Sequence, residues 1–525
     1  FTGNRAALDV EIKVEAWADR ILSKLSDEQG QKMLSTEFGA MNEIMADLYA
    51  DTGDERWLKA YRHFAHRAII DPLSQHKDIL AGKHGNTQVP KLYGDLIHHI
   101  HTGDKTTGDA AKFFWDEVAA HHSFATGGHG KDEYFGEPDK LNDRVDGRTA
   151  ETCNVYNMLK FARTLFSLKP DARYAAFQER ALFNHILASM DDADGRTCYM
   201  VPVGRGVTHE YQDMMESFTC CVGTGMESHA LHGDGIYFES WDEFWVNLYT
   251  PSTVEWKKKD VKVEVLTDLP EGESVKVRIS TAQPAEFTLK LRRPSWVGDG
   301  FKVSVNGTAM ADAASALNDY VTIKSKWHDG DTVEMTLPKT LRAEPVPDNP
   351  HRMALMWGPL VLAGDLGPEN TPGGRPDVPV IVSENFLNPS AWLAPVDGKP
   401  GCFRTQGAGK ERDVDFVPFY RLHRRTYAVY WDVLTPAEWE KHSQELAAAR
   451  ERQRKLEKAT VAFAQPGEMQ AERDYHQQGE ESEPDRIMGR AARRGKKWFS
   501  FDLPVDETHP MSAVVTYYND EWRKR

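Results

Sequence analysis

Apolar residues recur at helical spacing in the first part of the chain. Residues 39–69 show this pattern, with a break at the turn 52–54. Similar helix–turn–helix units turn at 102–104 and 169–171. Such hairpins cannot bury their apolar faces alone, so they stack on neighbouring hairpins. Because the units are uneven in length, the pattern predicts a closed helical toroid over residues 1–243 rather than a regular solenoid.

Near residue 244 the hydrophobic repeat changes to two residues. Short alternating segments such as 261–267, 275–280 and 287–293 are typical of half-buried strands. Turn residues separate the segments about every 8–12 positions, a spacing that favours an antiparallel β-sandwich. We expect this domain to cover residues 244–365.

The remaining sequence is less regular. Residues 366–460 begin with a linker rich in Pro, Gly and Asn and continue into the strand-like segment 419–434. A polar helix follows, opened by Thr435 and Pro436, and its charged residues indicate a solvated face. Residues 461–525 predict the start of a further β module that is interrupted by the end of the chain.

Composition narrows the class of protein. The chain has 525 residues, of which 27% are charged and 40% hydrophobic, typical of a globular protein of several domains. The formal net charge of -16 argues against nucleic acid and anionic membrane surfaces as partners. No run of about 18 apolar residues is present, so the sequence predicts no membrane span.

The cysteines are the first candidate chemistry. The chain has five, an odd and sparse set that does not suggest a disulfide framework. Cys153 follows Glu151 at the start of a predicted helix, where the helix dipole favours a thiolate. With the adjacent pair Cys220 and Cys221, these residues could form a tetrahedral Zn²⁺ site. The alternative is that the cysteines are buried as small apolar side chains.

A glycine-rich segment at 125–143 carries several carboxylates. Among them, Glu133 precedes Tyr134, and burial against an aromatic ring would raise its pKa and suit it to general acid catalysis. The alternative is a solvated acidic loop. His84 precedes another helix, where a structural role and a role in binding are both open.

These motifs, in this order, resemble those of the β-L-arabinofuranosidase group, glycoside hydrolase families 127 and 146, with the closer likeness to 146. The motifs are "EFGAMNEIMADLYADTGD", "KHGNTQVPK", "TGGHGKDEYF", "ETCNVYNMLK" and "CCVGTGMESH". The resemblance covers most of the chain. It implies a multidomain α plus β protein, with an (α/α)6 barrel that carries the active site and antiparallel β-sandwich domains after it. The helices predicted before residue 244 are too few to close such a barrel, so we expect N-terminal barrel helices to be missing.

The resemblance also assigns residues. It implies a Zn²⁺ ion held by Glu151, Cys153, Cys220 and Cys221, with Cys220 as the nucleophile. It implies Glu133 as the acid/base, with Glu137 as the alternative. The residues expected to contact the sugar are His84, Glu37, Asn42 and His129.

The implied activity is that of a retaining exo-glycosidase. It would release β-linked L-arabinofuranose from oligosaccharide or polysaccharide substrates such as arabinan and pectin side chains. The alternatives are a glycosidase for another pectic sugar, a barrel glycosidase or lyase that uses only carboxylates, and a non-catalytic carbohydrate-binding remnant. Such substrates favour a periplasmic or extracellular location, whereas free thiols also suit the cytoplasm.

Overall fold

The computed structural model describes residues 3–35, 38–213, 215–310, 316–369, 377–487 and 490–517. The chain divides into two compact units, Phe1–Pro436 and Ala437–Arg525. The first unit combines helices with sheets and contains all the candidate site residues.

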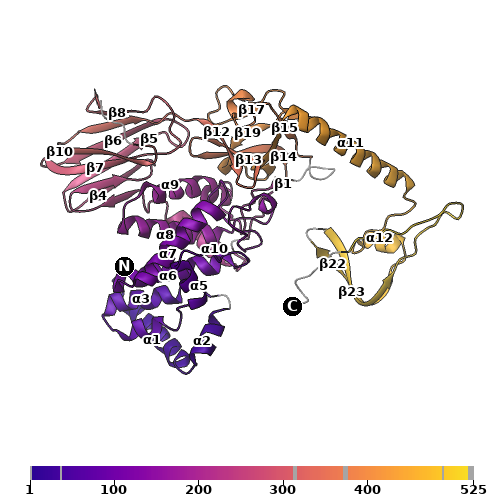
Figure 1. The fold of residues 1–525 in the computed structure, drawn as a ribbon, viewed down its shortest axis with the longest axis horizontal. Coiled ribbons are helices and arrows are strands. Elements are labelled where there is room, and N and C mark those ends of the chain that lie inside the picture. The colour runs from indigo at the N-terminus through magenta and orange to yellow at the C-terminus, as the bar shows by residue number, and fades with distance from the viewer. Residues whose placement is uncertain are drawn as a thin grey trace. The chain divides into compact units, whose positions relative to one another are not determined.

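The first unit starts with helices, as the apolar periodicity predicts (Figure 1). Single π-helical turns, Val118–His122 and Leu182–Ile186, extend α7 and α9. The helices are α1 (Arg5–Leu22), α2 (Asp27–Leu34), α3 (Met41–Thr52), α4 (Arg56–Tyr61), α5 (Arg67–Ser74), α6 (Gly85–Thr102), α7 (Lys105–Glu117), α8 (Thr152–Leu168), α9 (Ala172–Ala181) and α10 (Cys220–Ala230).

The predicted helix turns are confirmed. Gly53 ends α3 and Gly103 ends α6, both in the left-handed conformation (φ 69° and 73°) that glycine adopts without strain. Asp104 and Asp171 then cap α7 and α9 by accepting hydrogen bonds from backbone N–H groups of the next turn. Short side-chain and glycine signals therefore set these helix ends.

One apolar cluster joins the helices around α8. The apolar face of α8 is buried, and it packs with side chains from α5, α6, α7 and α9. The buried residues of that face are Val155, Met158, Leu159, Ala162, Leu165 and Phe166. This packing fixes the helix whose first turn carries the Glu-x-Cys motif.

Two sheets follow the helices and share one apolar cluster. One has the strand order β10-β7-β3-β2 and the other β4-β5-β6-β11-β8-β9. Their strands are β2 (Tyr237–Glu239), β3 (Glu243–Val246), β4 (Ser252–Trp256), β5 (Val261–Thr267), β6 (Ser274–Thr281), β7 (Ala285–Arg293), β8 (Lys302–Val305), β9 (Thr308–Ala309), β10 (Asp319–Trp327) and β11 (Thr332–Thr336).

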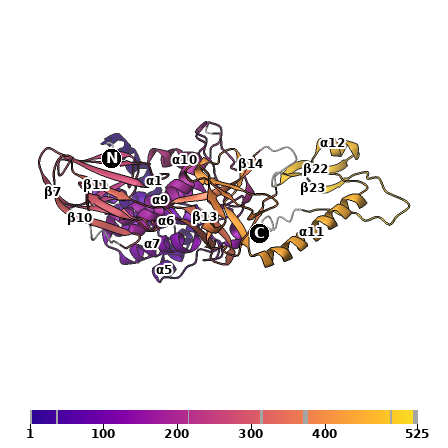
Figure 2. The same cartoon turned by 90° about the horizontal axis from the view of Figure 1, so that it is seen from above.

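A further sheet is built from later strands along the path β16-β17-β19-β14-β13-β21-β15-β18, with β12 on β13 and β20 on β14. Its strands are β1 (Arg205–Val207), β12 (Leu341–Val346), β13 (Asn349–Trp357), β14 (Leu360–Pro368), β15 (Val380–Val382), β16 (Leu393–Pro395), β17 (Phe403–Thr405), β18 (Gly409–Lys410), β19 (Asp415–Pro418), β20 (Arg425–Ala428) and β21 (Tyr430–Leu434). Figures 1 and 2 show both groups of strands on the same side of the helices.

This sheet corrects two sequence expectations. The predicted boundary at residue 365 falls inside β14, and the predicted linker 366–400 contributes β15 and β16. The strand β1, from the region predicted as helical, pairs with β20. These pairings join residues far apart in sequence, which local alternation does not encode.

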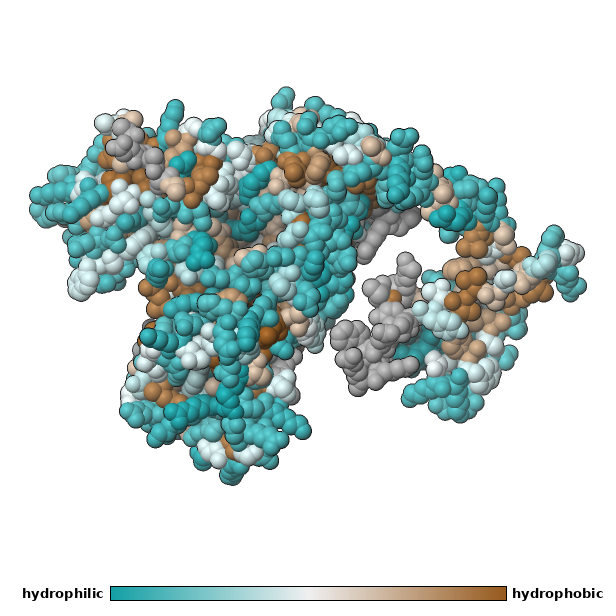
Figure 3. Space-filling view, in the orientation of Figure 1, coloured by the Kyte–Doolittle hydropathy of each residue, from teal (hydrophilic) through white to brown (hydrophobic). Residues whose placement is uncertain are grey.

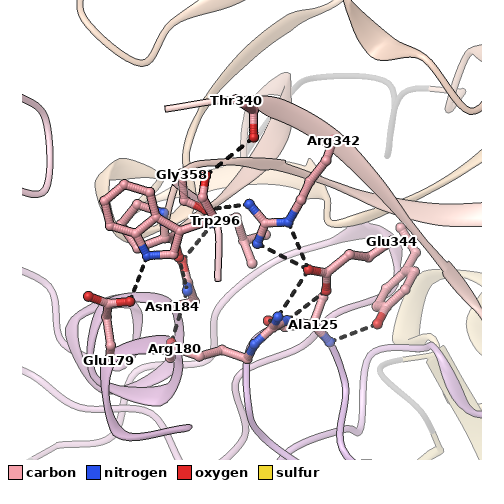
Figure 4. A network of polar contacts seen from close by, with 12 residues as sticks. Ala125, Glu179, Arg180, Asn184, Trp296, Thr340, Arg342, Glu344 and Gly358 are labelled. Atoms are coloured by element: carbon pink, nitrogen blue, oxygen red, sulfur yellow. Dashed lines mark hydrogen bonds and ion pairs between the residues drawn. The ribbon is translucent and has the colours of Figure 1, made fainter. Parts of the chain in front are cut away.

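Adjacent charges on α9 connect the helices to both groups of strands (Figure 4). Glu179 accepts hydrogen bonds from Arg292 of β7 (2.5 Å) and from the Trp296 indole (2.7 Å). Arg180 forms a two-pronged pair with Glu344 of β12 (2.6 and 3.0 Å), which Arg342 also contacts. Two neighbouring residues thus dock two different sheets on one helix.

The second unit contains α11 (Pro436–Ala459), α12 (Met469–Asp474) and a hairpin of β22 (Gln478–Ile487) and β23 (Arg490–Ser500). The polar helix is confirmed, since none of its residues is buried. The unit exposes large apolar side chains, including Phe463. Hydrophobic residues appear on its surface as brown areas in Figure 3. Across the described helices, none is both long and apolar enough to cross a membrane.

Candidate active site

A tight hairpin turn presents Glu133. Lys131 and Tyr134 exchange two backbone hydrogen bonds of 3.0 Å, which leaves Asp132 and Glu133 at the two central positions. Both have positive φ, 49° and 71°, a strained conformation for residues with a side chain. The Gly85 N–H donates to the Glu133 carbonyl (2.7 Å) and holds the turn against the start of α6. Strain of this kind, maintained by surrounding contacts, is typical of functional sites.

His84 faces this carboxylate. It is the N-cap of α6, and its Nδ1 accepts a hydrogen bond from the Thr87 N–H (3.2 Å). Because Nδ1 is the acceptor, the proton of the neutral ring is on Nε2. Nε2 lies 3.5 Å from Glu133 Oε2. The predicted sugar-pocket histidine is therefore part of the Glu133 site.

Tyr199 links Glu133 to the cysteines, and sequence reasoning missed it. Its hydroxyl donates a hydrogen bond to Glu133 Oε1 and lies 3.9 Å from Cys220 Sγ. Burial and the bond to Glu133 raise the pKa of Tyr199, so the hydroxyl remains a donor. The signal in the sequence is weak, because Tyr199 reaches the site through the bridge between Glu151 and Met200.

The predicted metal ligands come together at two helix starts. Glu151 directly precedes α8, Cys153 is in its first turn, and Cys220 begins α10. Glu151 Oε1 lies 3.7 Å from the sulfur of Cys220 and 3.7 Å from that of Cys221. The Cys220 and Cys221 sulfurs are 4.0 Å apart, and those of Cys153 and Cys221 are 3.2 Å apart.

This donor set fits a zinc ion. Tetrahedral ligands about 2.3 Å from Zn²⁺ lie about 3.8 Å apart, close to three of these four separations. The Cys153–Cys221 pair would have to open slightly. Glu151 Oε2 is buried without a hydrogen-bond partner in the described chain. Burial, followed by the negative charges of Cys220 and Glu133, raises the pKa of Glu151 to about 8. A cation would relieve this cost.

The three thiols differ in access. Cys153 and Cys221 are buried, whereas Cys220 is exposed. Hydrogen bonds from the Cys153 and Cys221 thiols lower the pKa of Cys220. Cys153 also contacts the Thr224 hydroxyl (3.0 Å), a second partner that the sequence did not reveal. Cys220 is therefore the sulfur that combines thiolate character with access to a substrate.

Two further residues predicted to contact the sugar, Asn42 and His129, are buried. Asn42 is buried and donates to the Lys91 carbonyl (2.6 Å) and to Asp95 (3.1 Å), so it joins α3 to α6. His129 is completely buried and stacks on Phe135 at 4.9 Å. Burial lowers the pKa of His129 to about 3, which keeps the ring neutral. Asn42 and His129 are thus buried within the fold, and their expected contacts with the sugar stay a prediction.

The two remaining predictions have different outcomes. Glu137 is exposed and lies outside both groups of potential metal ligands found among the described residues, whereas Glu133 belongs to one of them. Glu37 lies outside the described residues. The geometry thus favours Glu133 over Glu137 as the acid/base candidate.

Comparisons with known families agree with the fold and the site. The family model "Beta-L-arabinofuranosidase, GH127 catalytic domain" matches residues 1–234, and "GH127 middle domain" matches 243–339. Residues 455–525 match a family of unknown function, DUF6805. The two GH127 models together cover more than half of the chain.

Individual relatives are distant. A non-reducing end β-L-arabinofuranosidase from Bifidobacterium longum subsp. longum is 24% identical over 433 residues, and the match covers 69% of this chain and 62% of that protein. The chain thus spans less than two thirds of that relative's length.

Two solved structures share the fold. A GH127 β-L-arabinofuranosidase from Geobacillus stearothermophilus T6 has a TM-score of 0.58 and 20% identity, over 75% of this chain and 72% of that one. A GH127 β-arabinofuranosidase has a TM-score of 0.63 and 22% identity, over 83% and 75%. The two family models define the class of protein, the glycoside hydrolases. The chain belongs to the GH127 group of that class; the closer likeness to family 146 stays a prediction.

Proposed function

We propose that this chain is a retaining exo-glycosidase that releases L-arabinofuranose in β linkage, with Cys220 as nucleophile and Glu133 as acid/base. The observation that carries the proposal is the Tyr199 hydroxyl, which contacts both Glu133 and Cys220. One hydroxyl therefore bridges the two groups.

We also propose an architecture for the helical region and for the two sheets that follow it, from the way their apolar side chains cluster. The helical region would be part of an (α/α)6 barrel, and the two sheets that share one apolar cluster would form a β-sandwich. The GH127 structural neighbours support this interpretation at the level of the fold.

In the first step, the Cys220 sulfur attacks the anomeric carbon of the sugar. Glu133 gives its proton to the glycosidic oxygen as the C–O bond breaks and the C–S bond forms. The aglycone leaves with that proton, and the sugar stays on Cys220 as a thioglycoside. The His84 Nε2–H and the Tyr199 O–H, both at Glu133, stabilise the carboxylate that results.

In the second step, Glu133 takes a proton from water as the water oxygen attacks the anomeric carbon. The C–S bond breaks, and Cys220 leaves as a thiolate. Two displacements at one carbon give net retention. Glu151, Cys153, Cys220 and Cys221 would hold Zn²⁺, whose charge favours thiolates at neutral pH.

The test is hydrolysis of an aryl β-L-arabinofuranoside by the purified chain. Cys220→Ser should lower kcat about 10³-fold or more, because the nucleophile is lost. Glu133→Gln should lower kcat about 10²–10⁴-fold on substrates with poor leaving groups. Cys402→Ser and Glu137→Gln are the matched controls, since both lie outside the ligand groups and should stay near wild type.

Mass spectrometry of the quenched reaction should show one pentose on the peptide that contains Cys220. Full activity of Cys220→Ser would reject the thiolate mechanism and favour a carboxylate nucleophile. If the wild type cleaves another pectic sugar, the substrate assignment fails while the mechanism stands. Binding of arabinan fragments without turnover would support the carbohydrate-binding alternative.

A further inference from the structure

The segment that leads to Cys220 is held by residues more than 200 positions later in the sequence. It begins as β1, which pairs with β20 in the register Arg205 to Ala428 and Val207 to Tyr427. Just beyond β1, the Tyr211 hydroxyl donates to His423 Nδ1 at 2.6 Å. A helical-region loop is thus bonded to the loop that enters β20.

The imidazole has one suitable orientation for this bond. His423 Nε2 lies 2.9 Å from the Tyr420 carbonyl oxygen, which can only accept. The ring proton is therefore on Nε2, and Nδ1 is free to accept from Tyr211. The local chain of bonds fixes the tautomer that Tyr211 needs.

Arg424 completes this contact, which we call the Tyr211 clamp (Tyr211, His423 and Arg424). Its guanidinium lies over the Tyr211 ring at 4.1 Å. The same side chain binds Asp191 (2.7 Å) and Asp194 (3.1 Å). Arg424 has φ 54°, so the fold maintains a strained backbone to place these groups.

Tyr211 and its neighbour Gln212 contact residues that directly adjoin Tyr199 and Cys220 in the sequence. Tyr211 bridges Cys198, the neighbour of Tyr199, and the Gln212 N–H donates to the Thr197 carbonyl (2.9 Å). The Gln212 side chain accepts a hydrogen bond from Thr219, which directly precedes Cys220. The segment that contains Tyr199 is also held by the hydrogen bond from the Thr152 N–H to the Tyr199 carbonyl (2.9 Å).

We propose that the Tyr211 clamp positions Tyr199 and Cys220, so that the sheet containing β20 is a working part of the active site. Tyr211, His423 and Arg424 are positioning residues and touch neither the sugar nor the metal ligands. The effect on catalysis rests on the function proposed above. The effect on the mobility of the segment does not.

Tyr211→Phe removes only the hydroxyl, and Tyr320→Phe is the matched control. Tyr320 donates a bond of the same length, 2.6 Å, to Asn247 in the other group of strands. We expect Tyr211→Phe to lower kcat roughly tenfold to a hundredfold, because small misplacements of reacting groups have effects of this size. KM should stay within about twofold, and the metal content should stay that of wild type, since all four ligands remain.

Hydrogen–deuterium exchange provides a readout that needs no substrate. Amides in 197–200 and 215–219 should exchange faster in Tyr211→Phe than in the wild type or in Tyr320→Phe. A double-mutant cycle with His423→Leu should show that the two losses in kcat are far from additive, because both remove one bond.

Exchange and kcat equal to those of Tyr320→Phe would overturn the proposal. So would a rise in KM at unchanged kcat, because that would indicate a sugar contact. If the wild type hydrolyses no glycoside, the proposed function fails, and the exchange data alone decide whether the clamp exists.

Discussion

Two clusters of ionisable side chains lie in the first unit, and they differ in how their negative charge is balanced. Around α9, the chain provides its own cations. Arg292 pairs with Glu179. Arg180 and Arg342 pair with Glu344 (Figure 4). At the starts of α8 and α10, one carboxylate meets three thiols. The charges that raise the pKa of Glu151 there, those of Cys220 and Glu133, are negative.

The difference indicates what each cluster is for. An ion pair between a helix and a strand fixes their relative geometry, as Glu179 with Arg292 and Arg180 with Glu344 do for α9 and the two groups of strands. A buried set of anionic ligands without a matching cation is costly unless an ion from solution joins it. The chain's own cations therefore balance the α9 cluster, whereas the cysteine cluster has a donor set that suits a metal ion.

The largest expected effect comes from breaking the cysteine cluster. Cys153→Ser removes a ligand that is buried and not the proposed nucleophile. We expect kcat to fall about 10³–10⁴-fold, because the charge stabilisation that a metal provides is worth several kcal/mol. Added chelator should reproduce this loss in the wild type. Wild-type activity of Cys153→Ser after chelation would contradict the contrast between the clusters.

Breaking the α9 cluster should affect stability and leave chemistry intact. Arg292→Met leaves the buried Glu179 with one fewer cation and should lower the free energy of unfolding by about 3 kcal/mol or more. Urea unfolding measures this change. Arg278→Met, which removes an exposed pair with Glu264, is the control and should change it by less than about 1 kcal/mol. Equal losses of unfolding free energy in the two variants would show that the Arg292–Glu179 pair stabilises the fold no more than an exposed pair does.

The link between the metal ligands and the acid/base can be tested through Tyr199→Phe. A hydrogen bond to a charged group is worth about 1.5–3 kcal/mol, so kcat should fall roughly tenfold to a hundredfold. The metal content should not change, because Tyr199 is not a ligand. Loss of metal in this variant would place Tyr199 in the metal site instead.

The smallest effect concerns pH. Burial opposes ionisation of Glu344, but Arg180 and Arg342 hold its pKa at about 2, below the usual 4.5. Its contribution to stability is therefore present above about pH 4.5 and is lost as the pH falls toward 2. Wild type and Glu344→Gln should differ by about 1 kcal/mol at neutral pH and converge in acid. A stability difference between the two proteins that grows as the pH falls would show that the pKa of Glu344 is raised in the folded state and not lowered.

The sequence predicted the members of the cysteine cluster better than the residues around it. Glu151 and Cys153 belong to one helix start and Cys220 and Cys221 to another, so local patterns identify them. Tyr199 could not be predicted, because it reaches Glu133 through strand bridges between distant segments.

The same limit explains the other differences. Asn42 stands in a motif with site residues, yet its amide is used to pack α3 on α6. The boundary at residue 365 fails because β14 pairs with strands up to 428, and alternation within a strand does not name its partner. Helix ends at Gly53 and Gly103 were predictable because their signals are local.

Metal analysis of the purified wild-type chain is the sharpest test of the proposed zinc site. We expect one Zn²⁺ per chain, retained through gel filtration, lost in Cys153→Ser and unchanged in Arg292→Met. Wild-type protein that cleaves the β-L-arabinofuranoside at full rate with no bound metal would contradict it.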